Sequence, residues 1–64
     1  DQNAYLAAVR GWLAHFTLPC DAEAERAALQ WSQLRGSRSG RVAWQFACDW
    51  AGREPAERVA EVGR

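Results

Sequence analysis

Residues 40–52 read GRVAWQFACDWAG and carry more large apolar surface than any other stretch of this length in the chain. On a helix, which turns 100° per residue, most of these side chains fall on one broad face. That face holds Val42, Ala43, Phe46, Ala47 and Trp50. A second apolar flank holds Trp44, Cys48 and Ala51. A helix that is apolar around most of its circumference is normally buried between neighbours, so we expect residues 40–51 to be central.

The same stretch also alternates large and small residues, as a half-buried strand does. A strand needs a partner, because its backbone groups otherwise remain unpaired. No other segment of the chain reads as a strand. The pattern therefore favours a helix.

The composition indicates one small helical domain spanning residues 1–64. The chain has four Trp and thirteen Ala but neither Ile nor Met, which favours closely approaching helices over a β core. All eight basic residues are Arg, as in bacterial-like, GC-rich coding, and eight acids balance them to a net charge of zero. A dedicated nucleic-acid-binding domain is usually strongly basic, so we do not expect a nucleic-acid partner.

Two further helices are predicted before the central one. Over residues 3–16 an apolar side chain recurs at helical spacing, at Tyr5, Val9, Trp12 and Phe16. Leu18 is followed by a proline that disfavours the helical conformation, so the helix ends there. Over residues 21–35 the first residue is a good N-cap and Gly36 a good stop. The predicted buried face of this second helix holds Ala24, Ala27, Ala28, Trp31 and Leu34, and Leu29 points away from it.

A short last helix is predicted to begin at Glu54–Pro55, since proline is tolerated in the first helical turn. Its inward residues would be Ala56, Val59 and Ala60. The fold class is therefore all-α, a small bundle of about four helices with the third, residues 40–51, in the middle.

The reactive side chains do not form a recognisable catalytic or metal site. Cys20 and Cys48 have two open readings, a disulfide or two buried free thiols, and Cys is often buried without a bond. His15, Cys20, Cys48 and Asp49 lack the short paired spacing of zinc ligands. A Cys–His nucleophile would also need a third group to orient the base, and none is evident. We expect no catalytic residue, no metal and no cofactor.

Arg35, Arg38 and Arg41 place three cations within seven residues, with no acid between them. They lie in the loop that leads to the start of the central helix, where free N–H groups attract anions. The loop is a candidate site for a phosphate, a nucleic-acid backbone or an acidic partner. The alternative is a flexible loop whose Arg side chains point into water.

The second flank of the central helix predicts a protein contact. A last helix of two turns bearing only Ala and Val is too small to cover Trp44 fully. We therefore expect a partner-binding surface at Trp44, Leu29 and Cys48; the alternative is that the chain ends close over Trp44. The expected function is a non-enzymatic interaction module that binds another protein or itself. The alternative is a small helical nucleic-acid- or anion-binding domain that uses loop 35–41.

Neither a signal peptide nor a membrane span is recognisable, and we expect a cytoplasmic location without a membrane partner. Because the first residue is Asp, we expect a processed chain or a domain excised from a larger protein.

Overall fold

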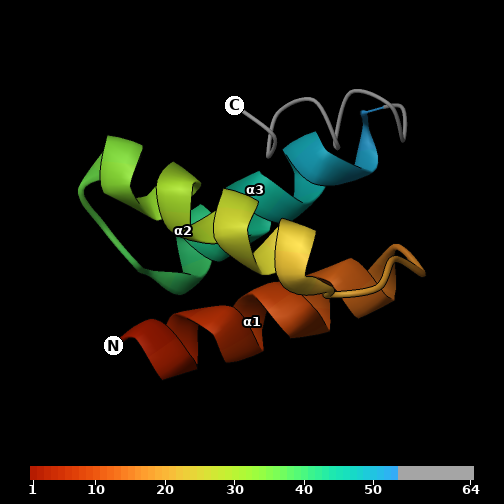
Figure 1. Ribbon diagram of the computed structural model, residues 1–64, viewed down its shortest axis with the longest axis horizontal. Helices are drawn as coiled ribbons and strands as arrows, with labels where there is room; N and C mark the ends of the chain where they lie inside the picture. Colours follow the sequence, from red (N-terminus) through yellow and green to blue (C-terminus); the bar gives the residue numbers. More distant parts are fainter. Residues whose placement is uncertain (54–64) are drawn as a thin grey trace.

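The computed structural model describes residues 1–53, which form three α-helices and no strand (Figure 1). They are α1, Gln2–His15; α2, Ala22–Arg35; and α3, Gly40–Ala51. The prediction of an all-α fold is confirmed for this part of the chain, and the helix bounds agree within one residue. The fourth helix predicted from Glu54–Pro55 lies outside the described residues, so three helices stand where about four were expected.

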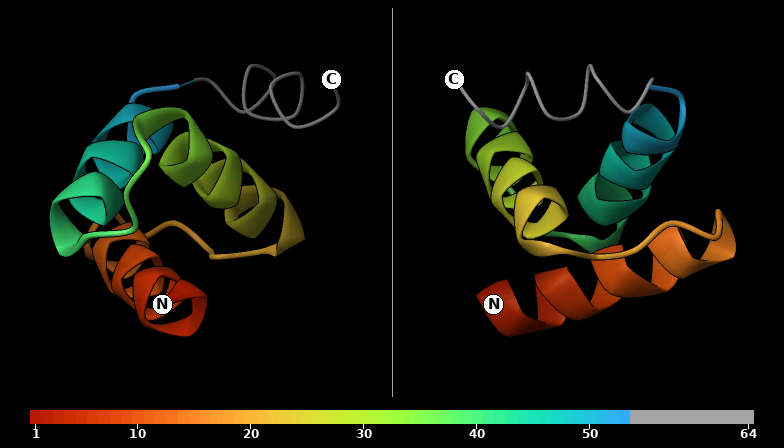
Figure 2. Two further views of the ribbon diagram at one scale, coloured as in Figure 1. Left: turned by 90° about the vertical axis from the view of Figure 1, so that its left-hand side faces the viewer. Right: turned by 45° about the vertical axis from the view of Figure 1, so that its right-hand side comes forward.

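The chain runs along α1, turns back along α2, and turns again into α3 (Figure 1). Figure 2 shows α2 and α3 lying across the same side of α1. The α3 helix packs against both others, most extensively against α1.

Capping side chains define where each helix starts. The carboxylates of Asp1 and Asp21 accept hydrogen bonds from the backbone N–H of the third following residue, at 2.8 and 2.9 Å. The hydroxyl of Ser39 does the same for α3 at 3.2 Å. Each cap satisfies an N–H group that has no partner within the helix. Because these caps act over only three residues, the starts of the helices could be predicted from the sequence.

The ends of α1 and α2 share one geometry but use different residues. At the end of α2, Gly36 has a φ of 67°, and the N–H groups of Gly36 and Ser37 bond back to the carbonyls of Gln33 and Ser32. Thr17 takes the same left-handed conformation after α1, with a φ of 57°. There the N–H of Leu18 bonds to the carbonyl of Leu13 at 2.9 Å. A left-handed residue with these two backward bonds is the Schellman helix ending, which normally uses glycine.

The core is built from one face of each helix. Its buried apolar members are Tyr5, Val9, Leu13, Ala24, Ala27, Ala28, Val42, Ala43, Phe46, Ala47 and Trp50. The hydroxyl of Tyr5 donates a hydrogen bond of 2.8 Å to the carbonyl oxygen of Ala28. A buried hydroxyl is costly unless it is bonded, so this contact makes Tyr5 acceptable in the core and ties α1 to α2.

The predicted buried face of α2 is wrong at its last residue. Leu34 is 84% exposed, whereas Ser32 is buried. The inward face continues from Ala24 and Ala28 to Ser32, at i, i+4 and i+8, and so turns away from Leu34. Ser32 tolerates burial because its hydroxyl donates to the carbonyl of Leu29 in its own helix, at 2.8 Å.

Candidate functional site

Four aromatic rings from two helices meet at one side of the molecule. Trp12 and His15 come from the last turn of α1, Phe16 is the C-cap residue of that helix, and Trp44 comes from the middle of α3. The ring centroid of Trp44 lies 4.5 Å from that of Trp12, 5.8 Å from that of Phe16 and 6.5 Å from that of His15. These separations are in the range of favourable ring contacts. We call these four residues the aromatic surface.

The aromatic surface is partly open to solvent. Trp12 is 39% exposed and Trp44 is 38% exposed, and among residues 1–53 only Leu34 joins them as an exposed large apolar side chain. His15 is exposed and Phe16 is half-buried. Both Trp side chains therefore bury part of their rings against each other and present the rest outward.

The sequence predicted Trp44 as a contact residue, whereas Trp12 was identified only as one of the apolar residues at helical spacing in the first helix. Trp12 follows Val9 by three residues, which places it at the edge of the α1 core face. Trp44 lies at the corresponding edge of α3. Two edge residues on adjacent helices form a shared surface, and only the packing of α1 on α3 brings them together.

The other predicted contact residues have different surroundings. Cys48 is exposed and lies one turn after Trp44 on α3, so it borders the aromatic surface. Leu29 is half-buried against the core on α2, whereas every ring of the surface comes from α1 or α3. Cys48 therefore lies beside Trp44, whereas Leu29 lies on a different helix.

Charge is sparse on the flanks of this surface. Arg41 is exposed and precedes Trp44 by three residues, on the same side of α3. Within residues 1–53 its side chain makes no hydrogen bond or ion pair. On α1 the exposed positions include four small uncharged residues, Ala4, Ala7, Gly11 and Ala14.

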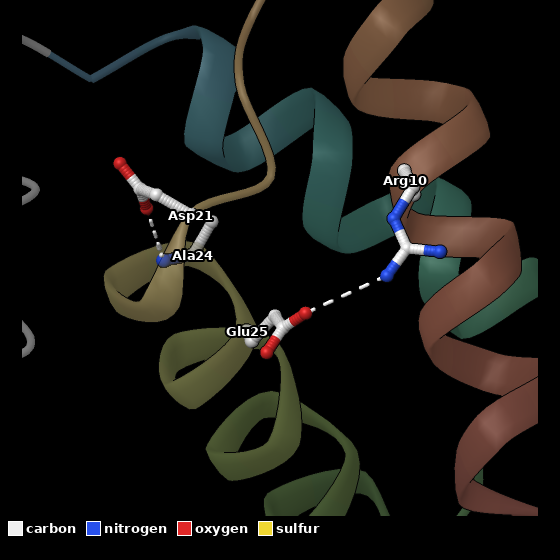
Figure 3. A network of polar contacts seen from close by, with 4 residues as sticks. All are labelled: Arg10, Asp21, Ala24 and Glu25. Carbon is white, nitrogen blue, oxygen red and sulfur yellow. Dashed lines mark hydrogen bonds and ion pairs between the residues drawn. The ribbon is translucent and has the colours of Figure 1, made fainter.

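The one arginine of α1 is turned toward α2. Arg10 pairs with Glu25 at 3.6 Å, one turn along α2 from the capping residue Asp21 (Figure 3). Burial raises the pKa of the nearby Cys20 thiol, the carboxylates of Glu25 and Asp21 raise it further, and Arg10 acts in the opposite direction. A raised pKa keeps this group a thiol rather than the reactive thiolate.

Both cysteines are free thiols, so Cys20 and Cys48 do not form the disulfide that the sequence left open. The expectation that both thiols are buried is wrong, because Cys20 is half-buried and Cys48 exposed. No group of three His, Cys, Asp or Glu side chains with metal-binding geometry occurs in residues 1–53.

The three arginines of loop 35–41 have different surroundings. The guanidinium of Arg35 lies 3.5 Å from the ring centre of Trp31, a cation–π contact. Arg38 lines an open pocket of about 380 Å³, whose other lining residues are Asp1, Ser32, Gln33, Gly36 and Ser37. Arg41 lies on α3 beside Trp44. The carboxylate of Asp1 in the Arg38 pocket disfavours a bound anion there.

In the described part of the chain, no helix is long and apolar enough to cross a bilayer.

Comparison with known proteins gives one match, to a family. No curated protein and no solved structure matches the chain. The model of the family described as protein of unknown function (DUF815) matches residues 1–54, which include all three helices. The chain therefore belongs to the DUF815 family.

Proposed function

We propose that this domain is a non-enzymatic protein-interaction module that binds its partner through the aromatic surface. The observation that carries the proposal is the contact of Trp12 with Trp44, two half-exposed indoles held 4.5 Å apart. Trp is the residue type most enriched at the energetic centres of protein interfaces.

The rigidity of this surface supports the proposal. Trp44 is held against three rings of α1, and α3 is anchored by the buried side chains of Phe46 and Trp50. Side chains that are already ordered before binding lose less conformational entropy in a complex. The surface therefore offers a large apolar area whose side chains lose little conformational entropy on binding.

The alternative function, anion or nucleic-acid binding by loop 35–41, has less support. Arg35 is stacked on Trp31, and Arg38 shares its pocket with an acidic residue. The net charge of zero also lacks the basic excess that nucleic-acid binding requires. The proposed partner is another protein or a second copy of this chain, and no membrane role is proposed.

Photo-cross-linking from Cys48 tests the proposal. In a Cys20→Ser background, Cys48 is coupled to a benzophenone reagent, and the labelled chain is illuminated in cell extract. The matched control carries the reagent on Gln30→Cys, Cys48→Ser, because Gln30 is exposed on α2. The proposal predicts discrete adducts from position 48 and none from position 30, and the adduct mass distinguishes a second copy from another protein. Equal yields from both positions would refute it.

A further inference from the structure

We propose that the partner segment bound by the aromatic surface is an amphipathic helix with acidic residues beside its apolar face. The inference rests on the proposed function and names the chemistry of the partner. It is carried by the charges around the surface and by the shape of α1 next to Trp12.

One exposed arginine borders the aromatic surface. Arg41, Trp44 and Cys48 are exposed at i, i+3 and i+7, so they follow one side of α3. Arg41 has no ion-pair partner among residues 1–53, and His15 adds an exposed imidazole. An unpaired guanidinium beside an apolar surface favours a carboxylate on the partner, and such complementarity sets orientation and specificity.

The carboxylates of the described residues all lie elsewhere. Asp1 caps the far end of α1, and the three acids at the start of α2 are Asp21, Glu23 and Glu25. Asp49 bonds Arg53 at 2.7 Å and lies on the opposite edge of α3 from Trp44, since five residues correspond to a turn of about 140°. Among residues 1–53, therefore, no acid compensates Arg41 at the aromatic surface.

The shape of α1 favours a helix as the bound segment. Ala4, Ala8 and Gly11 follow one another at i, i+4 and i+7 beside Trp12. A Cβ added at Gly11 would meet no other part of residues 1–53 within 4 Å, so the packing of these residues does not require glycine there. Small residues let the backbone of a second helix approach closely, as ridge-and-groove packing requires. The surface is formed by helices, and residues 1–53 offer no open strand edge, which favours a partner that satisfies its own backbone hydrogen bonds, as a helix does.

A second copy of this chain fits the same charges less well. In a symmetric dimer each aromatic surface would face its equivalent. Arg41 would then meet another aromatic surface bordered by Arg41, where residues 1–53 supply no carboxylate. The charges therefore favour a different, acidic chain.

The test is a selection from a displayed library of amphipathic helices with a fixed leucine face and randomised flanking positions. The 64-residue chain, Arg41→Glu and Arg26→Glu serve as separate targets. Arg26 is the matched control, because it is exposed on α2 and has no ion pair within residues 1–53. We expect acidic flanks against the wild-type chain and Arg26→Glu, and loss of that preference against Arg41→Glu. The selected acidic helices should bind Arg41→Glu about fivefold more weakly, the effect of losing one exposed ion pair.

The position at which a selected helix binds shows whether this inference alone fails or the proposed function fails with it. Indole N–H signals of Trp12 and Trp44 should shift when a selected helix is added, and Gly11→Leu should abolish the effect. Helices that shift these signals without acidic flanks would overturn the inference and leave the proposed function standing. Helices that bind elsewhere, or an absence of binders, would overturn both. If the wild-type chain sediments as a dimer in which Trp12 is buried, the partner is a second copy of the chain and not an acidic helix.

Discussion

The indole ring of Trp44 lies 4.5 Å from that of Trp12, across the contact between α3 and α1. Each ring is more than a third exposed, and each covers part of the other. The pair is therefore both a tertiary contact and a surface, so a loss of binding in a Trp variant has to be separated from a loss of stability.

Trp44→Ala should lower the free energy of unfolding by about 2–3 kcal/mol, less than a fully buried Trp because part of the ring is already in water. Urea unfolding followed by circular dichroism measures this. The control is Leu34→Ala, which should change stability by less than about 0.5 kcal/mol because that leucine is 84% exposed. Equal effects of the two substitutions would show that Trp44 does not pack against α1.

The two helix endings predict opposite effects of exchanging glycine and threonine. Thr17→Gly should stabilise the domain by about 1 kcal/mol, because a β-branched residue at positive φ is strained. Gly36→Thr should destabilise it by about 1–2 kcal/mol for the same reason. Thermal unfolding of both variants tests the pair, and a destabilised Thr17→Gly would show that Thr17 is not left-handed in solution.

Gly11→Ala should stabilise the domain by about 0.5–1 kcal/mol. Alanine has the higher helix propensity, and the added methyl group meets open space. The melting temperature should rise. A fall would mean that another part of the chain packs on Gly11.

Stability should decline as the pH rises above about 10, because of Tyr5. Burial raises the pKa of Tyr5 above its ordinary value of 10.0, although Arg35 and Arg38 act in the opposite direction. A group whose pKa is higher in the folded state contributes stability below its unfolded pKa and loses it as the pH rises through the folded pKa. The pKa of Cys20 is also raised above its ordinary value of 9.0, so this thiol also contributes stability that is lost as the pH rises above about 9.

Tyr5→Phe tests this assignment. The variant should lose about 1 kcal/mol at neutral pH, since the hydrogen bond to Ala28 is gone. In a Cys20→Ser background, its stability should change less between pH 9 and 11 than that of the matching Tyr5 chain. An unaltered pH dependence would place the titrating group elsewhere, because the chain has a single Tyr.

The local sequence was sufficient to predict the three helices of residues 1–53 and most of their caps. Asp21, Ser39 and Gly36 act on backbone groups within a few residues, so their effect does not depend on the rest of the fold. The burial of Phe46 and Trp50 was also predictable, because both lie on the broad apolar face of α3 together with Val42, Ala43 and Ala47. Thr17 was not predictable as a left-handed residue, since threonine disfavours that conformation and only the backbone bonds of Leu18 reveal it.

What only the tertiary structure decided is how wide each buried face is and which edges meet. Helical periodicity gives the direction of a face, but neighbouring helices determine where it ends. Leu34 is exposed and Ser32 is buried because α2 turns the side that carries Ala24, Ala28 and Ser32 toward the core. Trp12 and Trp44 form one surface because α1 and α3 place two separate edges 4.5 Å apart. Residues 32 positions apart in sequence acquire this relationship only through packing, and the candidate site therefore belongs to the fold rather than to any motif.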